Sequence, residues 1–266
     1  MTTLLWLIAK YLRANVHYYK YSPYSFSKIN THQQCPRKFK YIYVDKAPRL
    51  EEPSIPLAKG KFIHLLLEHH GDLQKVKQDK EFKEIVAVLG KDGIRDNYKI
   101  YTDFKKSAIG KKFTGFNEVF TELKLGLSQD LEFFNYDSYK DPNLLLRGYI
   151  DAGFEVNNRL LLVDWKTGKI PNTTNWGQLL YYSIGLFSKM PYDEIVIAYV
   201  YIEHQKVIHK KVTRKNIMKY KKALLDSIEP IEEDVHFKKN ETALCDWCPF
   251  QGHCQNDGTW DNEIPF

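Results

Sequence analysis

The sequence predicts an α/β fold in which a mixed central β-sheet is flanked by helices. Three observations lead to this prediction. The chain has 266 residues, 43% of them apolar, which is enough for a substantial core. Helical periodicity dominates the first part of the chain, and strand-like alternation begins after Gly115. From there strand and helix patterns alternate, which is typical of a sheet covered by helices.

Residues 1–24 are expected to form an N-terminal helical segment ahead of a single main domain, residues 25–266. The apolar run from Leu4 to Ala9 is too short to cross a bilayer, because a spanning helix needs about 20 apolar residues. It also lacks the basic start and the cleavage site of a leader peptide. Since no other stretch could cross a membrane, we expect a cytoplasmic protein without a membrane partner.

Three helical stretches are expected before the strands begin. Ser25 is a suitable N-cap for a helix that runs toward Tyr41. A second helix is predicted over residues 57–76, where apolar residues recur on one face. Residues 78–112 are rich in lysine and weakly periodic, and we expect them to be helical as well.

The second half of the chain contains the predicted strands. Residues 121–127 place a leucine at every second position, the pattern of a half-buried strand. The later elements are strands at 144–156 and 159–168, a helix at 175–190, a strand with a hairpin return at 193–212, and a basic helix at 213–233.

The pair Asn157-Asn158 separates two apolar runs and is a plausible two-residue hairpin turn, because asparagine tolerates the positive φ that such turns require. This turn sets a register in which Asp151 lies opposite Asp164, with Cβ atoms about 4.5–5.5 Å apart. Lys166 follows Asp164 by two residues, so its side chain is expected on the same face of the strand.

Two carboxylates at this separation repel each other unless a cation lies between them. Mg²⁺ and Mn²⁺ take oxygen ligands and keep positions open for water and phosphate. A neighbouring lysine can stabilise charge that develops on a phosphate oxygen. The arrangement therefore indicates phosphodiester hydrolysis. The simpler alternative is a salt bridge between Asp151 and Lys166 on a solvated sheet face.

Four short motifs occur in order along the chain: GKFIH from Gly60, GYID from Gly148, DWK from Asp164 and QLLYY from Gln178. This ordered set resembles the PD-(D/E)XK nuclease superfamily, specifically its RecB-like branch. The resemblance covers roughly residues 25–255. It implies a restriction-endonuclease-like fold and a single nuclease domain.

The resemblance gives a role to each matched residue. Asp151 and Asp164 would ligate a divalent metal ion, and Lys166 would be the catalytic lysine. His64 would be a further ligand from its helix, and a histidine nitrogen suits Mn²⁺ better than Mg²⁺. Taken alone, His64 would be interpreted as a histidine on the helix surface or at the edge of the core.

Three further residues enter through the same resemblance. Gln178 and Tyr182 are four apart and share a helix face, from which they would position the active site or the DNA strand. Taken alone, they would be ordinary packing residues. The family often has a glutamate on the strand before the Gly-x-x-Asp motif. Glu122 is the candidate for that position, and Glu118 is its rival.

The four cysteines lie near the two ends of the sequence: Cys35, Cys245, Cys248 and Cys254. Two disulfides are possible by count but are not expected in a reducing cytoplasm. The tight spacing of the last three favours a shared metal centre. Zinc and an iron–sulfur cluster both accept four thiolates, and His253 is an additional candidate zinc ligand.

One upstream cysteine with three clustered after the nuclease motifs is similar to the RecB-like nucleases that carry a four-iron, four-sulfur cluster. That group includes CRISPR-associated exonucleases and AddB-type nuclease domains. The resemblance implies that Cys35 and residues 245–254 hold such a cluster. The cluster would join the N- and C-terminal segments of the domain.

These features predict a Mg²⁺- or Mn²⁺-dependent deoxyribonuclease and favour an exonuclease over an endonuclease. The formal net charge of +6 is compatible with an anionic partner such as DNA, single-stranded or at duplex ends. Recombination, repair and CRISPR-adaptation proteins are the expected protein partners. The alternative is a cluster-bearing DNA-binding subunit that guides or measures DNA for a partner nuclease, and an intact set of two acids and a lysine argues against it.

Overall fold

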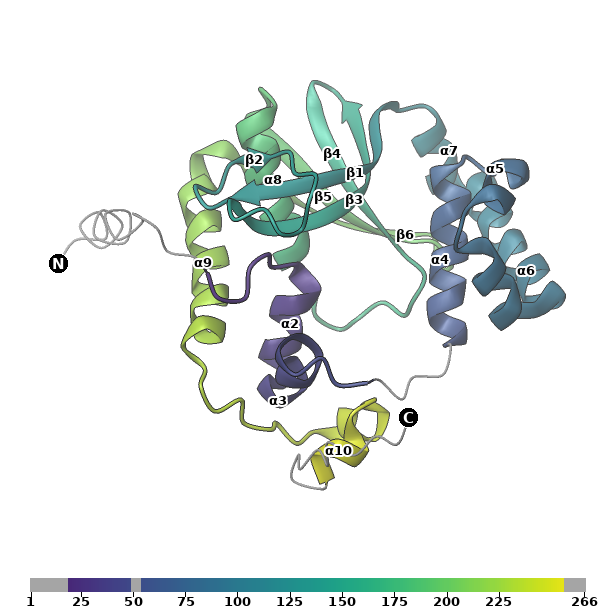
Figure 1. The fold of residues 1–266 in the computed structure, drawn as a ribbon. Coiled ribbons are helices and arrows are strands. Elements are labelled where there is room, and N and C mark those ends of the chain that lie inside the picture. The colour runs from purple at the N-terminus through teal and green to yellow at the C-terminus, as the bar shows by residue number, and fades with distance from the viewer. Residues whose placement is uncertain (1–18, 49–53, 256–266) are drawn as a thin grey trace.

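The computed structural model describes residues 19–48 and 54–255, which form a six-stranded sheet with helices on both faces (Figure 1). The strands lie in the order β2-β1-β3-β4-β5-β6. Among the described strands, β4 and β5 alone pair in parallel, so the sheet is mixed, as predicted. The strands are β1 (Asn117–Ser128), β2 (Phe133–Phe134), β3 (Leu144–Val156), β4 (Arg159–Lys166), β5 (Glu194–Tyr201) and β6 (Lys206–Thr213).

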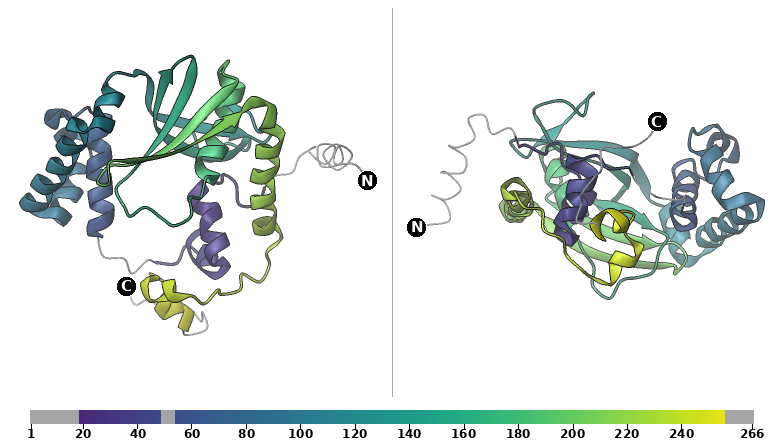
Figure 2. Two further views of the ribbon diagram at one scale, coloured as in Figure 1. Left: turned by 180° about the vertical axis from the view of Figure 1, so that it is seen from behind. Right: turned by 60° about the horizontal axis from the view of Figure 1, so that its bottom comes forward.

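Helices cover both faces of the sheet (Figure 2), and a separate hydrophobic cluster lies between the helices and each face. The helical elements are α2 (Phe26–Gln34), α3 (Pro36–Phe39), the π-helix η1 (Lys40–Val44), α4 (Ile55–Glu68), α5 (Leu73–Gln78), α6 (Phe82–Lys106), α7 (Ala108–Thr114), α8 (Gly177–Lys189), η2 (Arg214–Asn216), α9 (Ile217–Glu233), η3 (Ala243–Trp247) and α10 (Gln251–Gln255). Helices α2, α8 and α9 cover one face through Ile29, Leu179 and Leu224. Helices α4 and α6 cover the other through Ile63 and Phe104.

The first predicted helix is interrupted. The Ser25 hydroxyl accepts the backbone N–H of Lys28 and caps α2, as predicted. The helix ends at Gln34 because Cys35 precedes Pro36, and a residue before proline disfavours helical backbone. The single helix of the prediction is therefore divided into α2, α3 and η1.

The second predicted helix is also divided. Helix α4 ends at Glu68 and α5 begins at Leu73. Between them His70 and Gly71 have φ values of 51° and 82°, which a right-handed helix does not include. The lysine-rich stretch that follows is helical, as predicted, in α6 and α7.

Residues just before residue 25, the predicted start of the main domain, pack against the core. Tyr21 and Tyr24 are buried in the core cluster beneath α8. Tyr24 also forms a parallel bridge with Leu146 of β3. Most of the expected N-terminal helix, residues 1–18, lies outside the described residues. No helix in the described ranges is long and apolar enough to span a bilayer.

The hairpin between β3 and β4 has the predicted register. Asn157 and Asn158 have φ values of 51° and 59°, as a two-residue hairpin turn requires. The ladder pairs Ala152 with Val163 and stops there. Asp151 precedes Ala152 and Asp164 follows Val163, so the two acids that were predicted to lie opposite each other come just beyond the last pair of the ladder.

The ladder stops because β3 changes neighbours along this edge. Tyr24 replaces β4 there: its N–H donates to the Leu145 carbonyl at 2.7 Å, and its carbonyl accepts from Arg147 N–H at 2.8 Å. Between the two neighbours, residues 148–151 form a gap in which no described strand pairs with this edge of β3.

Side-chain alternation reverses next to this gap. Ile150 packs in the cluster beneath α8, whereas Ala152 packs in the cluster beneath α4. In a regular strand, residues two apart would share one face. On β1, Glu122 has a φ of 48°, an uncommon value for a residue with a side chain. The register between β1 and β3 brings this irregular residue beside Asp151.

Gly148 lies in the gap, and a Cβ atom there would come within 2.3 Å of the Tyr182 hydroxyl oxygen on α8. We expect Gly148→Ala to lower the free energy of unfolding by about 1–3 kcal/mol, the usual cost of overpacking. Denaturant unfolding followed by circular dichroism measures this change. Gly168→Ala is the control, because a Cβ there meets nothing within 4 Å. An equal loss in both variants would contradict the close packing of α8 on the gap.

Candidate active site

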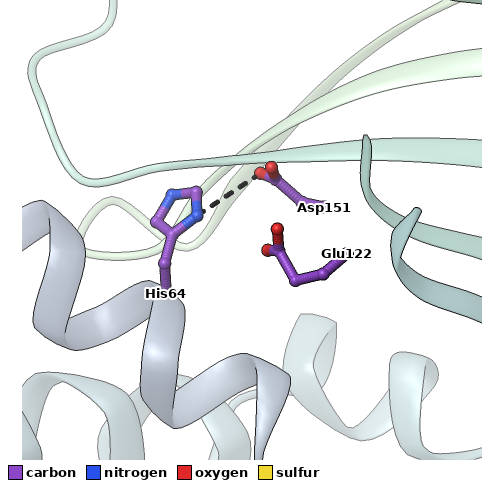
Figure 3. Close-up of side chains that lie close together, drawn as sticks. All are labelled: His64, Glu122 and Asp151. Carbon is purple, nitrogen blue, oxygen red and sulfur yellow. Dashed lines mark ion pairs between the residues drawn. The ribbon is translucent and has the colours of Figure 1, made fainter. Parts of the chain in front are cut away.

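Three side chains from different elements converge beside the gap in β3 (Figure 3). His64 comes from α4, Glu122 from β1 and Asp151 from β3. One ligand atom of each residue lies within 4.8 Å of those of the other two. An imidazole nitrogen and two carboxylates in this arrangement form a donor set that could hold a divalent cation.

The backbone of Trp165 fixes two of these side chains. In a continued ladder, Trp165 would exchange both of its backbone hydrogen bonds with Ile150. Because β3 has left β4 here, the Trp165 N–H donates instead to Asp151 Oδ2 at 2.7 Å, and its carbonyl oxygen accepts from His64 Nε2 at 3.0 Å. A hydrogen bond to a charged group contributes about 1.5–3 kcal/mol, so the bond to Asp151 firmly orients its carboxylate.

The hydrogen bond to the carbonyl oxygen also decides where the His64 ring carries its proton. Nε2 must be protonated to donate, so Nδ1 keeps its lone pair in the neutral ring. Nδ1 lies 3.7 Å from Asp151 Oδ2. Nδ1 and Oδ2 are then both acceptors and form no favourable contact with each other, but a cation between them could bind both. Metal-binding histidines are oriented in this way, with the second nitrogen bound to a carbonyl or carboxylate.

The carboxylates of the group are costly to ionise together. Burial, and then repulsion from Asp164, raise the pKa of Asp151 to about 6. Burial, and then repulsion from Asp151, raise the pKa of Glu122 to about 8. Each pKa unit corresponds to about 1.4 kcal/mol between the charged and neutral forms. A divalent cation among these oxygens would favour their charged forms and offset this cost.

Asp164 and Lys166 lie on the β4 side of the gap. Asp164 is buried, and its Oδ2 forms an ion pair with Lys166 Nζ, which agrees with the predicted shared face. The pair lacks hydrogen-bond geometry, so this oxygen has no hydrogen-bond donor among the described residues. The Lys166 ammonium lies 5.1 Å from the centre of the Tyr199 ring. Asp164 is outside the three-residue group, and its predicted role as a ligand remains a prediction.

Gln178 and Tyr182 lie one turn apart on α8, which packs over the gap. Tyr182 is buried against Gly148. Burial raises the pKa of Tyr182 above its ordinary value; contact with Gln178 opposes the rise, and the charges of Asp164 and Asp151 add to it. The phenol is therefore a neutral group close to both acids.

A cavity of about 470 Å³ opens beside His64 and Glu122. Glu68, one helical turn after His64, lines this cavity and adds to the raised pKa of Glu122, after burial and Asp151. Sequence reasoning missed Glu68, although its four-residue spacing from His64 on a predicted helix was a usable signal. The rival Glu118 faces another cavity and pairs with His70 at 3.6 Å.

The four cysteines are free thiols that line one cavity of about 400 Å³. Cys35 follows α2, whereas the other three lie about two hundred residues later, in and around η3 and α10. No three of these four described sulfur atoms lie within 4.8 Å of one another. His253 is not among the described residues that line the cavity, and its ring centre lies 6.1 Å from that of Tyr41.

Comparison with known proteins identifies a family for most of the chain. The family model described as "PD-(D/E)XK nuclease superfamily" matches residues 23–255. This range includes the three converging side chains, the Asp164–Lys166 pair and all four cysteines. The match therefore covers the whole described site and well over half of the sequence.

Similar curated proteins include two subunits of clostridial ATP-dependent helicase/nucleases. The one from Clostridium botulinum is 32% identical over 130 residues, which are 44% of this chain and 10% of that protein. The one from Clostridium kluyveri is 31% identical over 143 residues, 48% of this chain and 11% of that protein. The match thus covers about a tenth of each relative. A solved structure, "Crystal structure of SSO0001", aligns over 95% of this chain and 94% of that chain, with a TM-score of 0.37 and 13% identity.

Mn²⁺ should raise the melting temperature of the protein, because a ligand at 100 times its Kd stabilises the folded state by about 2.7 kcal/mol. Asp151→Asn and Glu122→Gln should each lose most of this rise, since each removes a charged ligand. Calorimetric scans in Mn²⁺ and in EDTA measure the effect. Asp92→Asn is the control, because its side chain on α6 is 84% exposed. An equal rise in all variants would show that the ion binds elsewhere.

Proposed function

The chain belongs to the PD-(D/E)XK nuclease superfamily, and from this premise we propose that it is a metal-dependent nuclease that hydrolyses the phosphodiester bonds of DNA. The observation that carries the proposal is the convergence of His64, Glu122 and Asp151 from three elements. The neighbouring Asp164–Lys166 pair supplies the lysine that the chemistry needs beside the carboxylates.

His64, Glu122 and Asp151 hold a divalent cation in this proposal. When bound, such a cation would neutralise phosphate charge and provide a source of hydroxide near neutral pH. The residues fit such an ion, because two crowded carboxylates and an imidazole lone pair face one another. Both Mg²⁺ and Mn²⁺ accept carboxylate oxygen, and the imidazole favours Mn²⁺.

Lys166 and Asp164 act from the neighbouring strand. The Lys166 side chain is partly exposed, so its ammonium can donate to a phosphate oxygen and stabilise the charge that develops as the P–O bond breaks. Asp164 holds this ammonium at the edge of the site, and its buried oxygen could complete the ligand set. Gln178 and Tyr182 position these groups from α8.

We propose exonuclease action on DNA ends during recombination, repair or DNA processing, with CRISPR adaptation among the candidate processes. The similar clostridial proteins are named as subunits of a combined helicase and nuclease. These names support the proposal that this chain acts together with a helicase. The net charge of +6 favours an anionic substrate.

A four-iron, four-sulfur cluster is the proposed occupant of the cysteine cavity. A zinc ion with four thiolates at about 2.3 Å needs sulfur atoms about 3.8 Å apart. The four sulfurs do not form so tight a group, and a cavity of about 400 Å³ leaves room for a larger inorganic centre. Thiolate ligation would join the segment after α2 to the end of the domain.

Lys166→Ala should slow DNA cleavage by about 10²–10³-fold without loss of DNA binding, since removing one donor to developing charge costs that much. Asp151→Ala and Asp164→Ala should abolish cleavage. Time courses on end-labelled linear and on circular DNA, with Mn²⁺ or EDTA, measure the rate and separate exonuclease from endonuclease. Lys169→Ala, an exposed lysine nearby, is the control. Wild-type turnover of Lys166→Ala would overturn the site, and cleavage of circular DNA would overturn exonuclease action.

Anaerobically purified protein should be brown, with absorption near about 400 nm and about four irons per chain. Cys35→Ser should lower stability as much as Cys248→Ser, because the centre closes a loop of about two hundred residues. Elemental analysis and thermal melts measure both effects. One zinc without iron, or a colourless protein of full stability, would contradict the cluster.

A further inference from the structure

A strip of aromatic and basic side chains extends from the candidate active site over β1, β3 and the loop that precedes β3. It consists of Lys124, Arg147, Tyr149 and Tyr139, and is called the tyrosine strip below. On β3, Tyr149 lies two residues before Asp151, and Arg147 lies four before it. At a rise of about 3.3 Å per residue, these positions are about 7 Å and 13 Å from Asp151.

The tyrosine strip and the acidic group share one side of the sheet. Lys124 and Tyr149 are opposite each other in the β1–β3 ladder. Their neighbours Leu123 and Ile150 pack in the cluster beneath α8, so Lys124 and Tyr149 point away from α8. Glu122 points to the same side, because it meets His64 of α4, the helix on the face opposite α8.

The aromatic rings of the tyrosine strip are open to solvent. Tyr139 is 48% exposed and Tyr149 is 45% exposed, and their hydroxyl oxygens are 3.5 Å apart. The guanidinium carbon of Arg147 lies 4.2 Å from the centre of the Tyr139 ring. The side chains therefore form one continuous surface that the fold itself does not bury.

Lys124 and Arg147 supply the positive charges of the tyrosine strip. Within the described ranges, neither Lys124 nor Arg147 forms an ion pair with an acid. The Lys124 ammonium donates to the Tyr136 carbonyl oxygen at 2.6 Å and lies 4.1 Å from that ring centre. Both cations keep charge available for an anionic ligand.

Open aromatic rings beside unneutralised cations match the chemistry of a single nucleic-acid strand. Unpaired bases stack on aromatic rings while the cations follow the phosphates. Bases inside a duplex are already stacked on each other, so the tyrosine rings would add little to duplex binding.

We propose that the tyrosine strip binds single-stranded DNA and leads it to the acidic group, so that the preferred substrate is a single-stranded end. The reaction at the end of this path rests on the proposed function. The binding itself needs neither the metal ion nor cleavage, so the two proposals can be tested apart.

The test is fluorescence anisotropy of labelled single strands and blunt duplexes in EDTA, where no cleavage takes place. Tyr149→Ala should weaken single-strand binding about 5- to 150-fold, the range for loss of one base–aromatic stack, and leave duplex binding unchanged. Tyr149→Phe keeps the ring and should bind as the wild type. Arg147→Ala should weaken the binding of both single strands and duplexes, because it removes a phosphate contact.

Arg95→Ala is the matched control for charge, since its side chain on α6 is 72% exposed and should leave binding unchanged. Thermal melts confirm that each variant is folded. The proposal for the tyrosine strip would be overturned if Tyr149→Ala bound single strands as tightly as the wild type. It would also be overturned if Tyr149→Ala lost the same affinity for single strands and for duplexes. If single-strand binding depends on Tyr149 but the protein never cleaves DNA, the binding proposal holds and the proposed nuclease function is wrong. If the protein cleaves DNA but its single-strand binding does not depend on Tyr149, the nuclease function holds and the binding proposal is wrong.

Discussion

Two hydrogen bonds to the backbone of Trp165 hold the candidate active site together. They exist because β3 is shared along one edge between β4 and Tyr24, and neither neighbour reaches the gap between them. The backbone groups freed there bind the Asp151 carboxylate and the His64 ring. Helix α4 and the sheet are thus joined through polar groups at the site itself, and the bonds that satisfy the strand also orient its candidate ligands.

The same gap explains the electrostatics of the site. Glu122 lies beside Asp151 on the adjacent strand, so two carboxylates meet next to an imidazole lone pair. Burial raises both pKa values, and repulsion adds to the rise, from Asp164 on Asp151 and from Asp151 on Glu122. The fold thereby maintains an arrangement that is costly without a cation, and Asp164 adds a third acid, which is buried and forms an ion pair with Lys166.

Local chemistry made much of this predictable from the sequence. The positive φ tolerated by Asn157-Asn158 set the hairpin register, and the two-residue spacing placed Asp164 and Lys166 on one face of their strand. The change of neighbour was not predictable, because Tyr24 lies more than a hundred residues from β3 and carries no pattern that marks it as a strand. Regular alternation could not choose between Glu122 and Glu118 either, since the choice depends on the irregular backbone at Glu122.

Anomalous scattering from crystals grown with Mn²⁺ tests the central claim most directly, namely that the gap in β3 creates a cation site. The account predicts one strong peak bounded by His64 Nδ1 and by carboxylate oxygens of Glu122 and Asp151, with His64 Nε2 still donating to the Trp165 carbonyl oxygen. A site of full occupancy that excludes Glu122 and Asp151, or a His64 ring that has left Trp165 to bind the ion through Nε2, would contradict it.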